Sequence, residues 1–329
     1  MAKTGSLALI GSETLLGREV RDLLAGSILG HDLSLIAAEA EESGKLTRQS
    51  GEAAFVVPLE RENVESARAI FLAGSVASIE KVREFAPKAQ LIDLTDAAED
   101  LPEARLRAPM VEREDHQVPP GAVHIIANAA AISITLVLDR LHALYPIRRS
   151  SAHIFEPASE RGARGVEELQ QQTVALLSFK GLSKETFDAQ LAFNMLPQYG
   201  EEAPASLEDV ELRIERHLAT LLAPGSAPIP SLKLIQAPVF HGYSISLWIE
   251  FAENPGVAAI EDALGADPVD LRAGDVEPPN VVGMAGQSGV AIGNVTLDRN
   301  NSQAVWLWIV VDNLRLRAEN AISVAQELL

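Results

Sequence analysis

The feature that most constrains the fold is a repeated alternation of short apolar runs with helix-period segments in the first part of the chain. The first run, Leu7–Ile10, leads into a turn that holds Gly11 and Gly17 and then into an amphipathic segment over 18–25. Later apolar runs lie at 33–38, 69–73, 90–94 and 124–127, and a helical pattern lies at 77–85. Strands that alternate with helices in this way form a parallel sheet with helices on both faces. We therefore predict an α/β protein whose N-terminal domain, residues 1–128, is Rossmann-like and doubly wound.

The remainder of the chain has a different pattern, with longer strands and loops rich in Pro, Ala, Ser and Gly. We predict strands at 150–156, 235–251 and 304–311, a helix that starts at Thr135 after the turn at Asn128, and helices at 162–178, 206–221 and 314–329. Within 235–251, Ile245, Leu247 and Ile249 occupy alternate positions, which is typical of a strand with one buried face. Long strands together with helices favour an α+β arrangement, a mixed sheet that carries helices on one face.

The amino-acid composition removes several kinds of chemistry. The 329 residues contain no cysteine, which excludes a thiol nucleophile, a disulfide and a cysteine zinc site. The seven histidines are scattered without the spacing of a helical metal site, so we expect no metal. A formal net charge of −19 disfavours a nucleic-acid partner. No apolar run reaches the roughly 20 residues that a membrane helix needs, and Met1–Thr4 lead straight into a strand, so we expect a cytoplasmic protein without a signal peptide.

The first glycine-bearing turn indicates the fold better than it indicates a bound dinucleotide. The usual fingerprint has three glycines, which let the backbone approach a pyrophosphate at a helix N-terminus. Gly11 and Gly17 are present, but Thr14 stands where the middle glycine is wanted. Glu13 adds a negative charge at the phosphate approach. We therefore expect the binding of NAD or NADP to be weak or lost.

The segment after the second predicted strand bears on the choice between the two cofactors. Residues 39–45 contain three glutamates and no arginine. Glu39 could accept hydrogen bonds from the ribose hydroxyls of NAD, whereas three carboxylates would repel the 2′-phosphate of NADP. NAD is therefore favoured over NADP, although an acidic, solvated loop explains the segment equally well. The candidate cofactor-binding positions from the strand-turn segments are Gly11, Thr14, Gly17, Glu39 and Gly74.

Five segments carry a resemblance to one enzyme family. Asn128 to Ser133 align without a gap with a central motif that reads Asn-Pro-Asn-Cys-Ser/Thr-Thr. Further similar segments are Ala158–Leu169, Ala192–Gln198, Ala237–Ser244 and Asp312–Ala321. Together they resemble aspartate-semialdehyde dehydrogenase, in order and over essentially the whole chain.

The resemblance implies the domain organisation and the activity of the family. The dinucleotide-binding domain would comprise residues 1–128 and the C-terminal helix 312–329, and residues 129–311 would form a catalytic and dimerisation domain. Family members are homodimers or tetramers, so a homodimer is expected here. They catalyse the NADP-dependent reductive dephosphorylation of aspartyl phosphate to aspartate semialdehyde, in amino-acid biosynthesis. The resemblance adds Asn313 to the candidate cofactor-binding positions.

The catalytic positions depart from the family one after another. The nucleophilic cysteine aligns with Ala131, the general-base histidine with Tyr243, and the active-site glutamine with Glu156. The arginine that holds the substrate carboxylate aligns with Gln236, which lacks the charge and the bidentate fork. A phenol with a pKa near 10 is a poor base at neutral pH. His241 would share a strand face with Tyr243 and is a possible substitute, although an ordinary structural histidine is the favoured interpretation.

Other positions near the expected anion site also lose positive or gain negative charge. An expected lysine aligns with Glu211, and an arginine-bearing loop is replaced by the acidic segment 95–100. At an effective dielectric constant of about 20, each such charge is worth up to a few kcal/mol at contact distance. We therefore expect neither phosphate nor aspartyl phosphate to bind well.

Three hypotheses follow. The first is a degenerate paralogue without aspartate-semialdehyde dehydrogenase activity, a pseudoenzyme retained as a dimeric binding or accessory protein. The second is an NAD(P)-dependent oxidoreductase of the family with altered substrate and chemistry, in which Tyr243 or His241 donates a proton. The third is a subunit that pairs with an active family member or another biosynthetic enzyme. The small-molecule ligand stays open.

Overall fold

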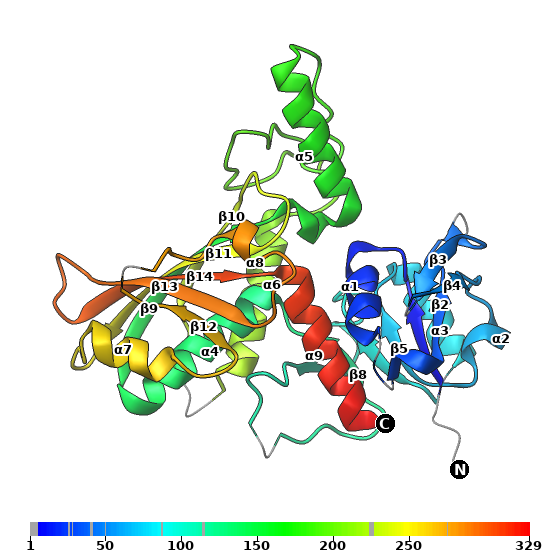
Figure 1. Ribbon diagram of the computed structural model, residues 1–329, viewed down its shortest axis with the longest axis horizontal. Coiled ribbons are helices and arrows are strands. Elements are labelled where there is room, and N and C mark those ends of the chain that lie inside the picture. The colour runs from blue at the N-terminus through cyan, green and yellow to red at the C-terminus, as the bar shows by residue number, and fades with distance from the viewer. Residues whose placement is uncertain are drawn as a thin grey trace. The chain divides into compact units, whose positions relative to one another are not determined.

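The computed structural model describes residues 6–25, 27, 29–39, 42–49, 51–86, 88–113, 116–223, 227–274 and 276–329. The N-terminal residues 1–4, part of the acidic segment 39–45 and part of the loop before residue 231 lie outside these ranges. The chain divides into two compact units (Figure 1). Unit 1 comprises residues 1–127 and 317–329, and unit 2 comprises residues 128–316.

Unit 1 is built on a six-stranded sheet in which every pairing is parallel, as predicted. The strand order is β2-β1-β5-β6-β8-β7. Its strands are β1 Ser6–Ile10, β2 Leu33–Ile36, β5 Ala67–Leu72, β6 Gln90–Asp93, β7 Ala104–Arg107 and β8 Val123–Ile126. The helices are α1 Leu15–Leu24, α2 Arg61–Val64, α3 Val76–Phe85 and the last part of α9 Asn313–Leu328.

The sequence did not predict β7 or the hairpin of β3 Leu46–Gln49 and β4 Glu52–Phe55. The hairpin strands are short and largely exposed, and β7 carries arginine at two of its four positions. These segments therefore lack the apolar pattern by which a strand is recognised.

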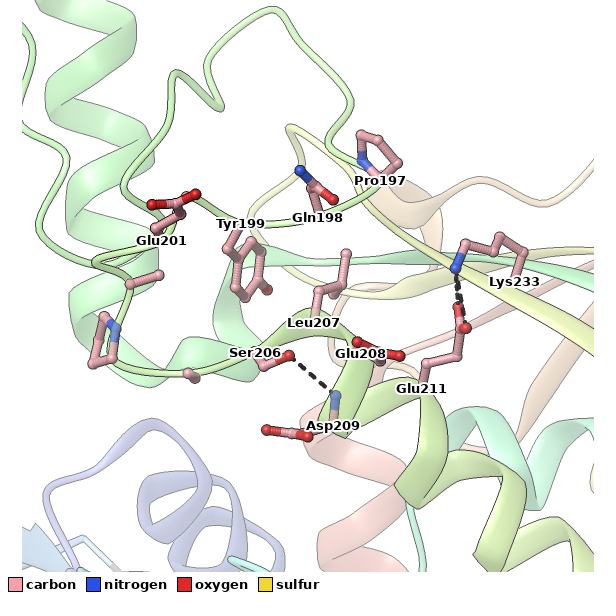
Figure 2. A pocket seen from close by; sticks show the side chains of 14 residues that line it. Pro197, Gln198, Tyr199, Glu201, Ser206, Leu207, Glu208, Asp209, Glu211 and Lys233 are labelled. Atoms are coloured by element: carbon pink, nitrogen blue, oxygen red, sulfur yellow. Dashed lines mark hydrogen bonds and ion pairs between the residues drawn. The ribbon is translucent and has the colours of Figure 1, made fainter.

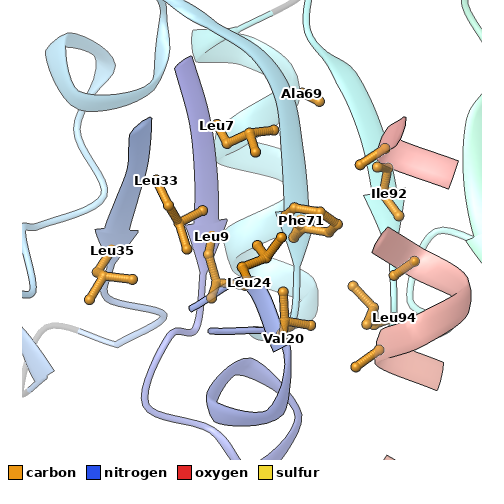
Figure 3. Packing of buried hydrophobic residues seen from close by; sticks show 14 of the residues in the cluster. Leu7, Leu9, Val20, Leu24, Leu33, Leu35, Ala69, Phe71, Ile92 and Leu94 are labelled. Atoms are coloured by element: carbon orange, nitrogen blue, oxygen red, sulfur yellow. The ribbon is translucent and has the colours of Figure 1, made fainter. Parts of the chain in front are cut away.

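Alternate residues of β1 supply two separate hydrophobic cores, because successive side chains of a strand point to opposite faces. Leu7 and Leu9 pack with Phe71 of β5 and with Val20 of α1 (Figure 3). Ala8 and Ile10 belong to the other cluster, together with residues of β5 and α3. Two apolar layers on one parallel sheet are the doubly wound arrangement that the strand–helix alternation predicted.

Unit 2 contains the second sheet, which has parallel and antiparallel pairings and the order β10-β9-β11-β14-β13-β12. Its strands are β9 Ile147–Glu156, β10 Ser231–Gln236, β11 Tyr243–Phe251, β12 Val269–Arg272, β13 Val290–Leu297 and β14 Ala304–Val311. The helices are α4 Ala129–Leu144, the short η3 Ala158–Arg161, α5 Gly162–Leu177, α6 Leu207–Leu221, α7 Val257–Leu264 and α8 Val281–Met284. The predicted mixed sheet with helices is confirmed.

Two element boundaries differ from the prediction. The single strand predicted at 235–251 is wrong, because β10 ends at Gln236 and β11 begins only at Tyr243. Pro238 cannot donate a ladder hydrogen bond, and Gly242 has a φ of 85°, which turns the chain back. The helix expected from Thr135 begins six residues earlier, at Ala129, because the Asn128 side chain caps it.

The alternation predicted for β11 is confirmed. Ile245, Leu247 and Ile249 are fully buried, whereas Trp248 on the opposite face is half-buried. None of the helices in the described ranges is long and apolar enough to span a membrane.

Candidate functional site

The position of the expected nucleophile lies in the first turn of α4. Asn128 caps this helix, with its Oδ1 accepting a hydrogen bond from the Ala130 amide at 2.8 Å. Its own amide donates to His217 Nδ1 at 3.0 Å. Ala131 follows in the first turn and is fully buried. The helix N-terminus that would stabilise a thiolate therefore presents a solvent-inaccessible methyl group.

Tyr243, the first residue of β11, joins two distant parts of unit 2. Its hydroxyl accepts a hydrogen bond from Asn128 Nδ2 at 3.2 Å and donates to Glu156 Oε2 at 3.3 Å. The side chain is fully buried, and this burial raises the pKa of the phenol well above its usual value of 10.0. The phenol therefore stays protonated at neutral pH and cannot serve as the general base.

Glu156 is the last residue of β9 and the centre of a buried polar network. Its Oε1 accepts a hydrogen bond from Arg161 Nη2 at 3.2 Å and lies at hydrogen-bond distance, 3.2 Å, from the Tyr199 hydroxyl. Complete burial raises the pKa of this carboxyl to about 7, against the opposing effect of the Arg161 charge. The carboxyl therefore exchanges its proton near neutral pH rather than near 4.5.

Gln236 lies beside Glu156 in the β9–β10 register, and its amide is satisfied at both ends. Its Nε2 donates to the backbone oxygens of Glu156 at 2.8 Å and Ala237 at 3.1 Å, and its Oε1 accepts from the Tyr199 hydroxyl at 2.6 Å. Since the Tyr199 hydroxyl has one proton, the shorter contact assigns that proton to Gln236. The longer contact to Glu156 then suits a protonated carboxyl that donates to Tyr199.

Four predicted positions, Ala131, Glu156, Gln236 and Tyr243, are thus fully buried, and the last three share one network. Tyr199 and Arg161 complete the network and were not predicted. Their positions in the sequence, in a loop and in the short η3, carry no periodicity or motif that would have indicated this role.

Tyr199 also forms part of the wall of a cavity of about 710 Å³ beside the start of α6 (Figure 2). The wall is rich in carboxylates, including Glu201, Glu208 and Glu211. Glu211, which aligns with an expected lysine, forms a 3.0 Å ion pair with Lys233 and accepts from the Leu234 amide at 2.7 Å. This carboxylate joins α6 to β10.

His241 lies in the turn before β11 rather than on the strand. The expectation that it shares a strand face with Tyr243 is therefore wrong, since alternation applies only within a strand. The imidazole is half-buried, and the described residues provide no hydrogen bond between it and the Glu156 network.

Asn313, a candidate cofactor contact, is fully buried at the start of α9. Its Oδ1 accepts from the Gly242 amide at 3.0 Å and from Ser159 Oγ at 3.2 Å. Its Nδ2 donates to Glu160 Oε1 at 2.7 Å. The Asn313 side chain therefore links the start of α9 to η3 and to the turn before β11, all within unit 2.

The glycine positions of unit 1 form a tight backbone cradle at the carboxyl ends of β1 and β5. Gly11 has a φ of 78°, and a Cβ there would lie 2.6 Å from the Ala73 oxygen. A Cβ on Gly17 would lie 2.0 Å from the Gly11 oxygen, and one on Gly74 would lie 2.7 Å from Ser78 Oγ. Backbone atoms therefore require glycine at positions 11 and 17, whereas a side chain at position 74 would displace Ser78 Oγ. The close approaches at these glycines are to the chain's own atoms, so they pack the turn after β1 against the turn after β5.

Thr14 caps α1. Its Oγ1 accepts a hydrogen bond from the Gly17 amide at 3.0 Å and donates one to the Gly11 carbonyl oxygen at 2.8 Å. Glu13, which was expected to bring a negative charge to the phosphate approach, pairs with Arg21 at 2.8 Å and Arg18 at 3.2 Å. Its pKa is lowered: burial would raise it, and the two arginines more than offset that effect.

In the acidic segment 39–45, after β2, the carboxylates of Glu39 and Glu42 lie in different environments. Glu39 is exposed, whereas Glu42 Oε2 accepts a hydrogen bond from the Ala38 amide at 2.9 Å, which the sequence did not indicate. In the segment 95–100, Asp96 forms a 2.6 Å ion pair with Arg317. Within the described ranges, no group of three or more His, Cys, Asp or Glu side chains could hold a metal ion.

Comparisons with known proteins point to one family. Residues 138–316 match the family described as semialdehyde dehydrogenase, dimerisation domain. The USG-1 protein homologue of Pseudomonas aeruginosa is 29% identical over 336 residues, covering 100% of this chain and 99% of that protein. The aspartate-semialdehyde dehydrogenase of Rickettsia bellii is 28% identical over 344 residues, with coverage of 100% and 99%.

Solved structures are similar over the same length. A probable aspartate-semialdehyde dehydrogenase from Pseudomonas aeruginosa has a TM-score of 0.86 at 28% identity, covering 98% of each chain. Aspartate semialdehyde dehydrogenase II of Vibrio cholerae, complexed with ASA, has a TM-score of 0.85 at 22% identity, with coverage of 100% and 98%. The second likeness is one of fold alone.

Proposed function

Because this chain belongs to the semialdehyde dehydrogenase family, we propose that it is a homologue without aspartate-semialdehyde dehydrogenase activity, which acts as a dimeric binding or accessory protein. The observation that carries this proposal is the buried network of Tyr243, Glu156, Tyr199 and Gln236, which fills the place of the expected catalytic groups. Ala131 beside it offers no nucleophile.

The chemistry of the family reaction supports the proposal. A thioester route needs a thiolate, and a methyl group at Ala131 cannot supply one in a chain without cysteine. The reaction also needs a base, and a phenol whose pKa is raised, at Tyr243, cannot take that role. An anionic substrate needs a cation in place of Gln236, and Glu156 instead adds a carboxyl group. Three independent requirements fail in one region.

The direct test is a turnover assay with purified protein, aspartate semialdehyde, phosphate and either NADP or NAD. We expect no rate above a blank without protein. Turnover that disappears in Glu156→Ala or His241→Ala would contradict the proposal, because it would place the reaction in this region of unit 2.

Homodimerisation is part of the same proposal. The matched family is described as a dimerisation domain, and one face of the unit 2 sheet carries half-buried aromatic side chains, Phe155, Trp248, Trp306 and Trp308. Aromatic residues are enriched in the cores of protein interfaces. We expect a dimer in sedimentation-velocity ultracentrifugation. A monomer at micromolar concentration would exclude it.

The glycine cradle of unit 1 favours a second candidate, an NAD(P)-dependent oxidoreductase with altered substrate and chemistry. Gly11, Gly17 and Gly74 would let a dinucleotide pyrophosphate approach the N-terminus of α1, and Glu39 would accept from the ribose hydroxyls of NAD. Such a cofactor, when bound, would supply hydride chemistry. NAD is favoured over NADP because the segment 39–45 has no arginine for a 2′-phosphate.

Cofactor binding discriminates between the two candidates. Fluorescence titration with NADH and NADPH is expected to show weak or no binding, and NADH to bind better if either does. Micromolar affinity for NADH would favour the oxidoreductase, and no binding at millimolar concentration would exclude it. The third hypothesis is an accessory subunit that pairs with an active family member. Such a subunit would co-purify with that enzyme under native conditions. For every candidate we propose a cytoplasmic location and no nucleic-acid partner.

A further inference from the structure

A second cavity of unit 2 lies beside the first turns of α5. Its volume is about 680 Å³, and it is bounded by α5 on one side and by residues 183–186 and 204–205 on the other. Pro204 and Ala205 also form part of the wall of the larger cavity beside α6, so these two residues separate the two spaces. In contrast to the larger cavity, this one has arginine in its wall.

Arg161 supplies a buried cation with unused hydrogen-bond donors. Its side chain is 14% exposed and forms an ion pair with the fully buried Glu156 at 3.2 Å. That contact, from Nη2, is the one side-chain hydrogen bond that the described residues give to the guanidinium, and the solvent-inaccessible Nε has no partner among them. A guanidinium has five N–H donors in a planar fork that fits a carboxylate. Because Nε is out of reach of solvent, the donors open to a ligand in the cavity are the terminal N–H groups that do not bond Glu156, and these favour an anionic group.

The rim of the cavity carries charges of both signs. Arg164, Glu167 and Glu185 are exposed, and the described residues give none of them an ion pair. Glu168 also lines the cavity but is already engaged, because it accepts hydrogen bonds from the amide of Thr186 at 2.6 Å and from other groups. The groups left for a ligand are therefore the exposed Arg164, Glu167 and Glu185, together with the terminal N–H donors of Arg161 that do not bond Glu156.

We propose that this cavity binds a zwitterionic α-amino acid, with its carboxylate on Arg161 and Arg164 and its ammonium group toward Glu167 and Glu185. A phosphate or another polyanion would be repelled by the two glutamates, and a plain carboxylate would leave them without a partner. Pro204 and Ala205 offer an apolar wall to a ligand side chain. This site is independent of the proposed loss of dehydrogenase activity.

The test is isothermal titration calorimetry of the full chain with four probes, L-alanine, acetate, ethylamine and inorganic phosphate. We expect L-alanine to bind at least about tenfold more tightly than acetate or ethylamine, because each of these makes only one of the two charged contacts. Phosphate should bind more weakly than L-alanine. A Kd above about 10 mM for L-alanine, or equal or tighter binding of acetate, ethylamine or phosphate, would overturn the proposal.

Four single substitutions locate the binding. Arg161→Lys keeps the charge beside Glu156 but loses the fork, and Glu167→Gln removes a charge at the exposed rim. Each should weaken L-alanine binding about tenfold, whereas Glu167→Gln should leave acetate binding unchanged or stronger. The matched controls are Arg148→Ala and Glu80→Gln, which alter exposed charges of residues that do not line this cavity. Equal effects of site and control variants would show that binding occurs elsewhere and would refute the assignment.

Discussion

Replacing Tyr243 by phenylalanine removes one oxygen atom from the centre of unit 2 and leaves the ring in place. The hydroxyl bonds Asn128 Nδ2 at 3.2 Å and Glu156 Oε2 at 3.3 Å. These partners are 2% and 0% exposed, so water cannot replace the lost hydroxyl. A buried polar group left without a partner costs about 1–3 kcal/mol. Because both contacts are long, we take the low end for each, which gives a destabilisation of about 2 kcal/mol.

The loss should depend on pH, because the Tyr243 hydroxyl donates to a carboxyl that titrates near neutrality. Burial, offset in part by Arg161, raises the pKa of Glu156 to about 7. Above this value the carboxylate is ionised and needs its donors most. Below this pH the carboxyl group is neutral, so the loss of the Tyr243 hydrogen bond destabilises it less. The destabilisation should therefore be larger at pH 8 than at pH 6.

The assay is urea unfolding followed by tryptophan fluorescence, which reports on unit 2 because all three tryptophans lie there. With a slope of about 2 kcal/mol per M, the midpoint should fall by about 1 M. Tyr145→Phe is the matched control, since this residue is half-buried and its hydroxyl has no hydrogen-bond partner among the described residues. Equal midpoints for the two variants at both pH values would refute the idea that the buried network holds unit 2 together.

Three further predictions concern single substitutions. The pKa of Glu156 is about 7 in the folded protein and 4.5 ordinarily, so the stability that its protonation contributes is complete below pH 4.5 and is lost as the pH rises through 7. In urea unfolding, the free energy of unfolding of the wild type relative to Glu156→Gln should therefore rise by about 2 kcal/mol from pH 8 to pH 5.5. A difference that stays constant with pH would exclude the raised pKa. Thr14→Ala removes the α1 cap and should cost about 1 kcal/mol in calorimetry, with Thr14→Ser near wild type, and equal stability of all three would contradict the capping role. Ala131→Cys should give a thiol that reacts slowly with a disulfide reagent in the folded protein and should show no turnover of aspartate semialdehyde; turnover would mean that the missing sulfur alone had silenced the site.

The local hydrophobic pattern and the residue types present were sufficient to predict the fold class and the missing catalytic groups. Apolar runs such as Leu7–Ile10, separated by helix-period segments, determined the parallel sheet of unit 1, because periodicity is a property of neighbouring residues. The absence of cysteine and the methyl group of Ala131 are covalent facts that no fold can alter. The same reading joined β10 to β11 incorrectly, because the turn between them depends on the backbone conformation of Gly242.

Only the tertiary structure decided what surrounds the substituted positions. Tyr243 and Glu156 are 87 residues apart, and Tyr199 lies 43 residues from Glu156, so nothing local indicates that they meet. The acids that appeared to be added charges have cationic partners, Arg161 for Glu156 and Arg21 for Glu13. Burial and pairing depend on distances between residues that are remote in the chain. Those distances set whether a carboxyl group repels a ligand, titrates near neutral pH or holds the fold together.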